Sequence, residues 1–95
     1  MRSDIQSKIR RDFSPSDFYA AIEAIQRWDV EVKGLLDDRR IRCAVYLARG
    51  SLDRLRQMIA LGLQDYRDLI MAAEYEGEVR VRDFDHPFVR ADDHA

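Results

Sequence analysis

Cysteine is almost absent from this chain, since Cys43 is the only one in 95 residues, and an internal disulfide is therefore excluded. We interpret the lone thiol as a small buried apolar side chain rather than a nucleophile. Long apolar runs are missing as well, because none approaches the roughly 18 residues that a membrane-spanning helix needs. The N-terminal stretch MRSDIQSKIRRDF lacks the apolar core of a secretory signal. These absences predict a cytoplasmic protein with no membrane span.

Motifs for catalysis and cofactor binding are also missing. The sequence contains no G-x-S-x-G elbow, no P-loop and no H-E-x-x-H helix. Residue types that bind metals occur near the C-terminus, where they are Asp83, Asp85, His86, Asp92, Asp93 and His94. Their spacing matches no recognised metal site. We therefore expect a protein that is not an enzyme and that binds no cofactor and no metal.

Apolar residues, in contrast, are frequent enough for a folded core, because they make up 46% of the chain. Ninety-five residues predict a single domain that buries roughly two-thirds of its unfolded surface. The formal net charge is −2, but residues 1–64 carry 12 basic and 9 acidic side chains, whereas residues 65–95 carry 4 and 9. This balance argues against a protein whose whole surface binds polyanions.

The best-marked element begins at SPSDFYAAIEAIQRW, where Ser14 is a good N-cap and Pro15 falls at the first helical position. The side chains predicted to face the core recur at the helical period and are Phe18, Ala21, Ile22, Ile25 and Trp28. The following DVEVK alternates like a strand, but Val32 falls on the same helical face, and Gly34 suits the position after a helix end. We therefore predict one helix over residues 15–33.

The N-terminal stretch SDIQSKIRRDF has the spacing of a capping box, with Ser3 followed by Gln6. Its apolar side chains, Ile5, Ile9 and Phe13, recur every four residues. This pattern predicts either a short helix or an arm that docks by these three side chains.

Two helices are predicted after Gly34. Asp37 and Asp38 open the first, which stops at Gly50, and Ser51 caps the second. The side chains predicted to face inward are Ile41, Ala44, Val45 and Ala48 in the first helix, and Leu52, Leu55, Ile59 and Leu63 in the second.

The length of the second of these helices is ambiguous. Apolar residues follow 3-4 spacing over residues 52–76, which allows one long helix. Against it, Gly62 costs about 1 kcal/mol inside a helix, and Asp65 is typical of a new N-cap. We favour a break near residues 62–65, followed by a last helix that runs to Gly77.

The segments GSLDRLRQMI and QDYRDLIMAAEY resemble those of short, uncharacterised helical proteins from bacteria. The resemblance spans about residues 38–76 and implies a helical fold. No known activity comes with it, so it assigns no role to any residue.

A basic surface is predicted on the helix after Asp37 and on the turn that follows. Its members are Arg39, Arg42, Tyr46, Arg49, Arg54 and Arg56. Arginines interleaved with an aromatic ring can bind phosphates and stack on a base, so this surface makes nucleic-acid binding an alternative function. The simpler interpretation is a solvated helix face.

Acidic side chains cluster where the last helix is predicted to end, at Glu74, Glu76 and Glu78. Carboxylates at this end of a helix oppose the macrodipole. The cluster indicates either a frayed, solvated helix end or a contact with a basic partner, such as the arginines of a second copy.

The segment EVRVR after Gly77 alternates like a strand. Because no other stretch is predicted to be a strand, it has no expected pairing partner in its own chain. We predict that it docks as an extended arm on a helical surface, of its own chain or of a neighbour. The predicted arm contacts are Val79, Val81, Phe84 and Phe88, and a disordered acidic tail is expected to follow them.

Together these patterns predict an all-α protein with a compact bundle of four or five helices in residues 1–77 and an extended arm in residues 78–95. The function that fits best is non-enzymatic interaction with a protein partner or with a second copy of the chain. Nucleic-acid binding through residues 39–56 is the alternative.

Overall fold

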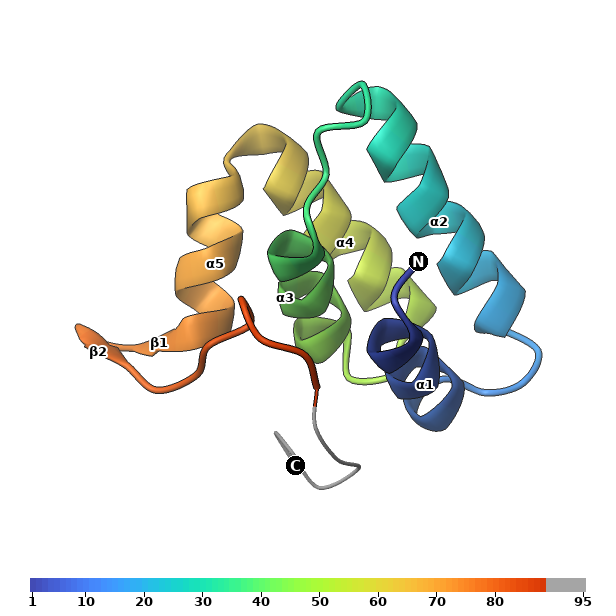
Figure 1. The fold of residues 1–95 in the computed structure, drawn as a ribbon, viewed down its shortest axis with the longest axis horizontal. Helices are drawn as coiled ribbons and strands as arrows, with labels where there is room; N and C mark the ends of the chain where they lie inside the picture. Colours follow the sequence, from blue (N-terminus) through green and yellow to red (C-terminus); the bar gives the residue numbers. More distant parts are fainter. Residues whose placement is uncertain (89–95) are drawn as a thin grey trace.

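The computed structural model describes residues 1–88, which form five helices followed by a short hairpin (Figure 1). The helices are α1 (Ser3–Asp12), α2 (Phe18–Glu31), α3 (Asp38–Ala48), α4 (Leu52–Gln64) and α5 (Tyr66–Glu74), and the hairpin strands are β1 (Tyr75–Glu76) and β2 (Val79–Arg80). The predicted all-α class is confirmed, and the number of helices in the described part is five.

Helix α3 is the centre of the fold. It packs against α1, α4 and α5, and Figure 1 shows it between α5 on one side and α1 on the other. Every residue from 41 to 46 is buried, because a helix with neighbours on all sides has no face left for solvent. The same core includes side chains from other helices, among them Ile5, Ile9, Trp28 and Leu55.

The helix starts that depend on a local cap agree with the sequence. The side chains of Asp37, Ser51 and Asp65 each accept a hydrogen bond from a backbone N–H two or three residues further on. The break before α5 is thereby confirmed. Gly50 follows α3 with φ +80°, and its missing Cβ makes room for the backbone carbonyl of Asp12.

Two other helix starts differ from the prediction. The N-terminal stretch is a helix rather than an arm, but Ser3 lies inside it and forms no capping hydrogen bond. Helix α2 begins at Phe18, three residues later than predicted, because a turn precedes it in which the N–H of Asp17 donates to the carbonyl of Ser14. DVEVK is the end of α2 and a turn, so its assignment to the helix is confirmed up to Glu31.

Gly62 lies inside α4 because of what packs against it. A Cβ at this position would lie 2.8 Å from Cζ2 of Trp28 and 3.1 Å from Cδ2 of Leu69. Trp28 is only 1% exposed, as predicted. Leu63, the next residue, was predicted to face inward but is 41% exposed, because Gly62 takes the inward position against Trp28 and Leu69.

The hairpin corrects the expectation that EVRVR has no partner in its own chain. Tyr75 pairs with Arg80 and Glu76 pairs with Val79, in antiparallel register. Gly77 has φ +65° at the first position of the two-residue turn, where a tight hairpin favours glycine. The sequence of β1 continues the helical pattern of α5, and this is why the last helix was predicted to extend to residue 77.

After the hairpin, residues 81–88 return across α3 toward α1 (Figure 1). Phe84 is fully buried and Phe88 is 8% exposed, and their ring centroids lie 5.7 Å apart. The N–H of Phe88 donates to Oδ2 of Asp4 at 3.0 Å. These contacts confirm that the aromatic part of the arm docks on the helices of its own chain.

Two further observations concern the limits of the described part. The predicted acidic tail falls mostly on residues 89–95, which lie outside the described residues. Among residues 1–88, no helix has the length and apolar character needed to cross a membrane.

Candidate interaction surface

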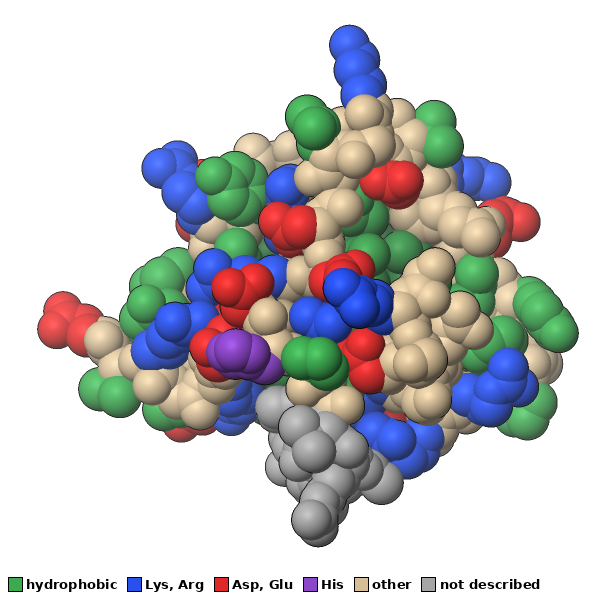
Figure 2. All heavy atoms as spheres, in the orientation of Figure 1, with side chains coloured by type: hydrophobic (Ala, Val, Ile, Leu, Met, Phe, Trp, Pro, Cys, Tyr) green, Lys and Arg blue, Asp and Glu red, His purple; other side chains and the backbone are tan. Residues whose placement is uncertain are grey.

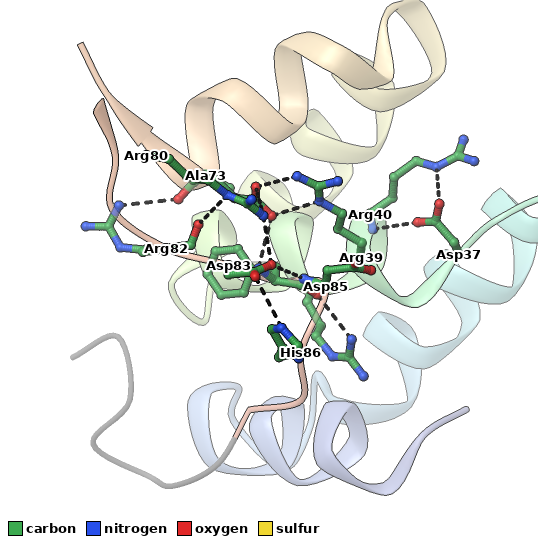
Figure 3. A network of polar contacts seen from close by, with 12 residues as sticks. Asp37, Arg39, Arg40, Ala73, Arg80, Arg82, Asp83, Asp85 and His86 are labelled. Carbon is green, nitrogen blue, oxygen red and sulfur yellow. Dashed lines mark hydrogen bonds and ion pairs between the residues drawn. The ribbon is translucent and has the colours of Figure 1, made fainter. Parts of the chain in front are cut away.

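A buried carboxylate, that of Glu74, organises the end of α5. Its side chain is 0% exposed. Arg39 donates to both carboxylate oxygens, from Nη2 at 2.6 Å and from Nε at 2.9 Å, and the backbone N–H of Phe84 donates to Oε2 at 3.0 Å. Arg80 completes the set with an ion pair at 3.1 Å. Figure 3 shows Arg39, from α3, and Arg80, from β2, in the same network of polar contacts.

The charge on Glu74 is stabilised despite its burial. Burial alone raises the pKa of the carboxyl group, but the hydrogen bonds from Arg39 and from the N–H of Phe84 outweigh it and hold the pKa below its ordinary value. The hydrogen bonding between Arg39 and Glu74 also raises the pKa of Arg39. The group is therefore a buried, ionised anchor with three separate donors.

The arginines of the hairpin region face the body of the protein. Arg80 also donates to Asp83 at 2.8 Å. Arg82 donates to Glu76 at 2.7 Å and to the carbonyl of Ala73 at 3.3 Å, and its guanidinium lies 4.9 Å from the centroid of the Tyr46 ring. The arginine side of EVRVR is therefore the side that is bonded to the rest of the protein.

Val79 and Val81 consequently face outward, and their predicted packing on the core is wrong. They are 63% and 47% exposed. Turning the strand over would carry Arg80 away from the buried carboxylate of Glu74, with which it pairs at 3.1 Å, and the loss of a partner strongly destabilises a buried charge. The need of Glu74 for cations therefore decides which side of the strand turns inward. We call the outward pair Val79 and Val81 the valine face.

The predicted basic surface is not a single exposed face, because α3 is buried on all sides. Arg42 is 3% exposed and Tyr46 is 6% exposed. Arg42 donates to Asp4 at 3.0 Å and to the carbonyl of Phe84 at 3.1 Å. The interpretation of this surface as solvated is therefore wrong for Arg42 and Tyr46. Of the residues predicted for this surface, those that the structure leaves exposed are Arg49, Arg54 and Arg56.

A second carboxylate, that of Asp4, holds the far end of the arm. Burial raises its pKa, but the hydrogen bonds from Arg42 and from the N–H of Phe88 lower it by more. The pKa of Asp4 therefore lies below its ordinary value. Residues 84–88 are thus fixed at one end by Glu74 and at the other by Asp4.

Sequence reasoning missed the roles of both carboxylates. The signal for Glu74 is its unfavourable place at a helix C-terminus. That signal predicted a solvated helix end or an external basic partner. Glu78, at the hairpin turn, is exposed. Glu76 accepts a hydrogen bond from Arg82 of the same chain. The contact with a basic partner that was predicted for this cluster is, for Glu74, made by arginines of the same chain.

Other potentially reactive groups form no site in the described part. Cys43 is fully buried, as expected, and burial raises its pKa to about 12, so it is a thiol and not a nucleophilic thiolate at neutral pH. Within residues 1–88, no three metal-ligating side chains gather at one place. His86 lies 3.3 Å from Asp83 at the surface, and the other predicted metal-ligand types, Asp92, Asp93 and His94, lie outside the described residues.

Comparison with known proteins found no matching family model, no matching curated protein and no matching solved structure. The resemblance of residues 38–76 to short bacterial helical proteins therefore stays a prediction. Inference about function rests on the geometry of the chain itself.

Proposed function

We propose that this protein is a non-enzymatic protein–protein interaction module and that the valine face of its hairpin is the contact surface. The observation that carries the proposal is the pattern of residues 79–82, in which Arg80 and Arg82 bond to groups of their own chain while Val79 and Val81 are exposed. Two β-branched side chains on one side of a short strand with an open edge are typical of a surface that another strand covers. The partner is a second protein or a second copy, met in the cytoplasm.

The hairpin is also held rigidly enough to serve as a binding element. An isolated two-stranded ribbon is marginal in water, but Arg80 joins this one to α5 through the carboxylate of Glu74, and Arg82 donates to the carbonyl of Ala73 in the same helix. A preorganised strand loses less entropy when it binds. Figure 2 shows that hydrophobic side chains gather at the projecting hairpin and over α5, where Met71 is 48% exposed.

Nucleic-acid binding has less support from the geometry. Arg39 and Arg42, two members of the predicted basic surface, already donate to Glu74 and Asp4. Phosphates would have to compete with these internal carboxylates.

A photo-crosslinking side chain at position 79, introduced into the chain in the cells that produce it, tests the proposal. The matched control is the same side chain at position 30, because Val30 is also a valine, is 75% exposed and lies on α2 on the other side of the molecule (Figure 1). We expect discrete protein adducts from position 79 and not from position 30. If position 79 gives no adducts beyond those of the control, the valine face is not a contact surface.

A further inference from the structure

We propose that the occupant of the valine face is a second copy of this chain, which pairs β2 with the β2 of the second copy in antiparallel register around Arg80. The inference rests on the proposed function and names its partner. It follows from the backbone and the side-chain register of the hairpin, which are self-complementary, and from its charges, which are compensated within each copy.

The backbone of Arg80 points to the open edge of the hairpin. In an antiparallel pair, hydrogen-bonded and non-hydrogen-bonded residue pairs alternate. Glu76 and Val79 close the two-residue turn, and the N–H of Val81 donates to the carbonyl of Glu74 at 2.7 Å. The pair between these two, Tyr75 with Arg80, is therefore the non-hydrogen-bonded one. The N–H and C=O of Arg80 face away from β1, where a second strand can reach them.

Placing the two copies of Arg80 opposite each other aligns the valines as well. In that register Val79 lies opposite Val81 of the second copy, and Val81 lies opposite Val79 of the second copy. Directly opposed β-branched pairs contribute to strand pairing. The two-fold axis brings the same patch of each copy together, as in most dimers, and the product is a four-stranded sheet with the valines of both copies on one face.

Repulsion between arginines is the main objection to this pairing, since like charges that face each other destabilise a sheet. In this chain the arginines are already paired within their own copy. Arg80 lies between Glu74 at 3.1 Å and Asp83 at 2.8 Å, and Arg82 bonds to Glu76 at 2.7 Å. Each copy therefore presents a strand whose positive charges are compensated.

The size of the contact sets its strength. The two residues of β2 with the adjacent Val81 bury far less than the roughly 1,200–2,000 Å² of a stable interface. The dimer is therefore weak and dependent on concentration.

Sedimentation of the purified full chain, over a concentration series that reaches the millimolar range, tests the pairing. Two double variants test the register of the pairing. In Val79→Glu/Val81→Lys, each introduced glutamate faces the introduced lysine of the second copy. In Val79→Glu/Val81→Glu, glutamates face each other. Both change only exposed positions, and circular dichroism checks that both fold.

We expect the wild type to dimerise with concentration, the Glu/Lys variant to keep that behaviour and the Glu/Glu variant to weaken it at least tenfold. A wild type that stays monomeric throughout, or two variants that dissociate alike, would overturn the pairing.

The proposed function has its own readout: if the wild type is monomeric while position 79 crosslinks to a different protein, self-pairing fails and the interaction module stands. If the wild type is monomeric and position 79 crosslinks to nothing, both fail.

Discussion

At the residue scale, the most informative side chain is Glu74. It is a charged group at the C-terminal end of a helix, where the macrodipole disfavours it, and it is also fully buried. Either circumstance alone destabilises a carboxylate. Arg39 arrives from α3 and Arg80 from β2, and the N–H of Phe84 adds a third donor. One residue thereby joins a helix, a hairpin and the segment that follows it.

Replacing this carboxylate by an amide should lower stability strongly. Glu74→Gln leaves the guanidinium groups of Arg39 and Arg80 without their buried counter-charge, and we expect a loss of about 3–5 kcal/mol in the free energy of unfolding. The control is Glu76→Gln, which removes the partner of Arg82 at a largely exposed site and should cost about 1 kcal/mol or less. Urea unfolding of both variants compares them. Equal losses would show that burial of Glu74 has no energetic role.

At the element scale, local signals were sufficient for helix boundaries but not for the hairpin. The caps at Asp37, Ser51 and Asp65 act within one turn of chain, so sequence reveals them. The end of α5 depends on something else: residues 75–76 leave the helix to pair with residues 79–80. Two residues of α3 contact this region, since Arg39 donates to Glu74 and the ring of Tyr46 lies against Arg82. No local sequence pattern reveals such contacts.

Helix α4 offers a prediction in which packing opposes propensity. Gly62→Ala adds a good helix former, which alone would stabilise the helix by about 1 kcal/mol. Its new Cβ, however, would lie 2.8 Å from the buried ring of Trp28. We expect a net loss of about 1–3 kcal/mol by thermal or urea unfolding, since overpacking a rigid ring forces the helices apart.

The matched control for this substitution is Gln57→Ala, at an exposed position of the same helix, which should change stability by less than about 0.5 kcal/mol. A Gly62→Ala protein that is more stable than the wild type would mean that α4 and α2 can separate at little cost.

At the scale of the whole molecule, the aromatic part of the C-terminal segment is a structural member of the core. Phe84 is fully buried, and its ring centroid lies 5.1 Å from that of Tyr46. Phe84→Ala should therefore lower the free energy of unfolding by about 3–5 kcal/mol. Val30→Ala, at an exposed site, should have an effect within about 0.5 kcal/mol of zero. A small loss for Phe84→Ala would indicate that the segment is only loosely attached.

Acid should weaken the whole molecule through two carboxylates. The ordinary pKa values of Glu74 and Asp4 are 4.5 and 3.8, and the folded protein lowers both. As the pH falls, the unfolded chain takes up protons first, so the stability from these groups is complete above about pH 5 and declines below that. Urea midpoints should be flat from about pH 7 to 5 and should then fall, less steeply for Glu74→Gln. A midpoint that rises with acid would contradict this.

The interaction surface could be predicted from sequence only in part. The docking of Phe84 and Phe88 follows from the cost of leaving aromatic side chains in water. The outward direction of Val79 and Val81 does not, because the alternation of a strand specifies two faces without saying which one is inside. Here Glu74 makes the choice, and its burial depends on Arg39, 35 residues away in sequence.

The hydrogen bond between Phe88 and Asp4 spans 84 positions of the chain, and this span has a consequence for the order of events during synthesis. At about 5–20 residues per second, about 4–17 s separate the addition of these two residues to the growing chain. During that interval the helices α2 to α5 are added one after another, and the segment that carries Phe84 and Phe88 across Arg42 is added after all of them. Among the described residues, Phe84 and Phe88 are therefore the last buried side chains to be made, and the helices can pack on one another before this segment covers them.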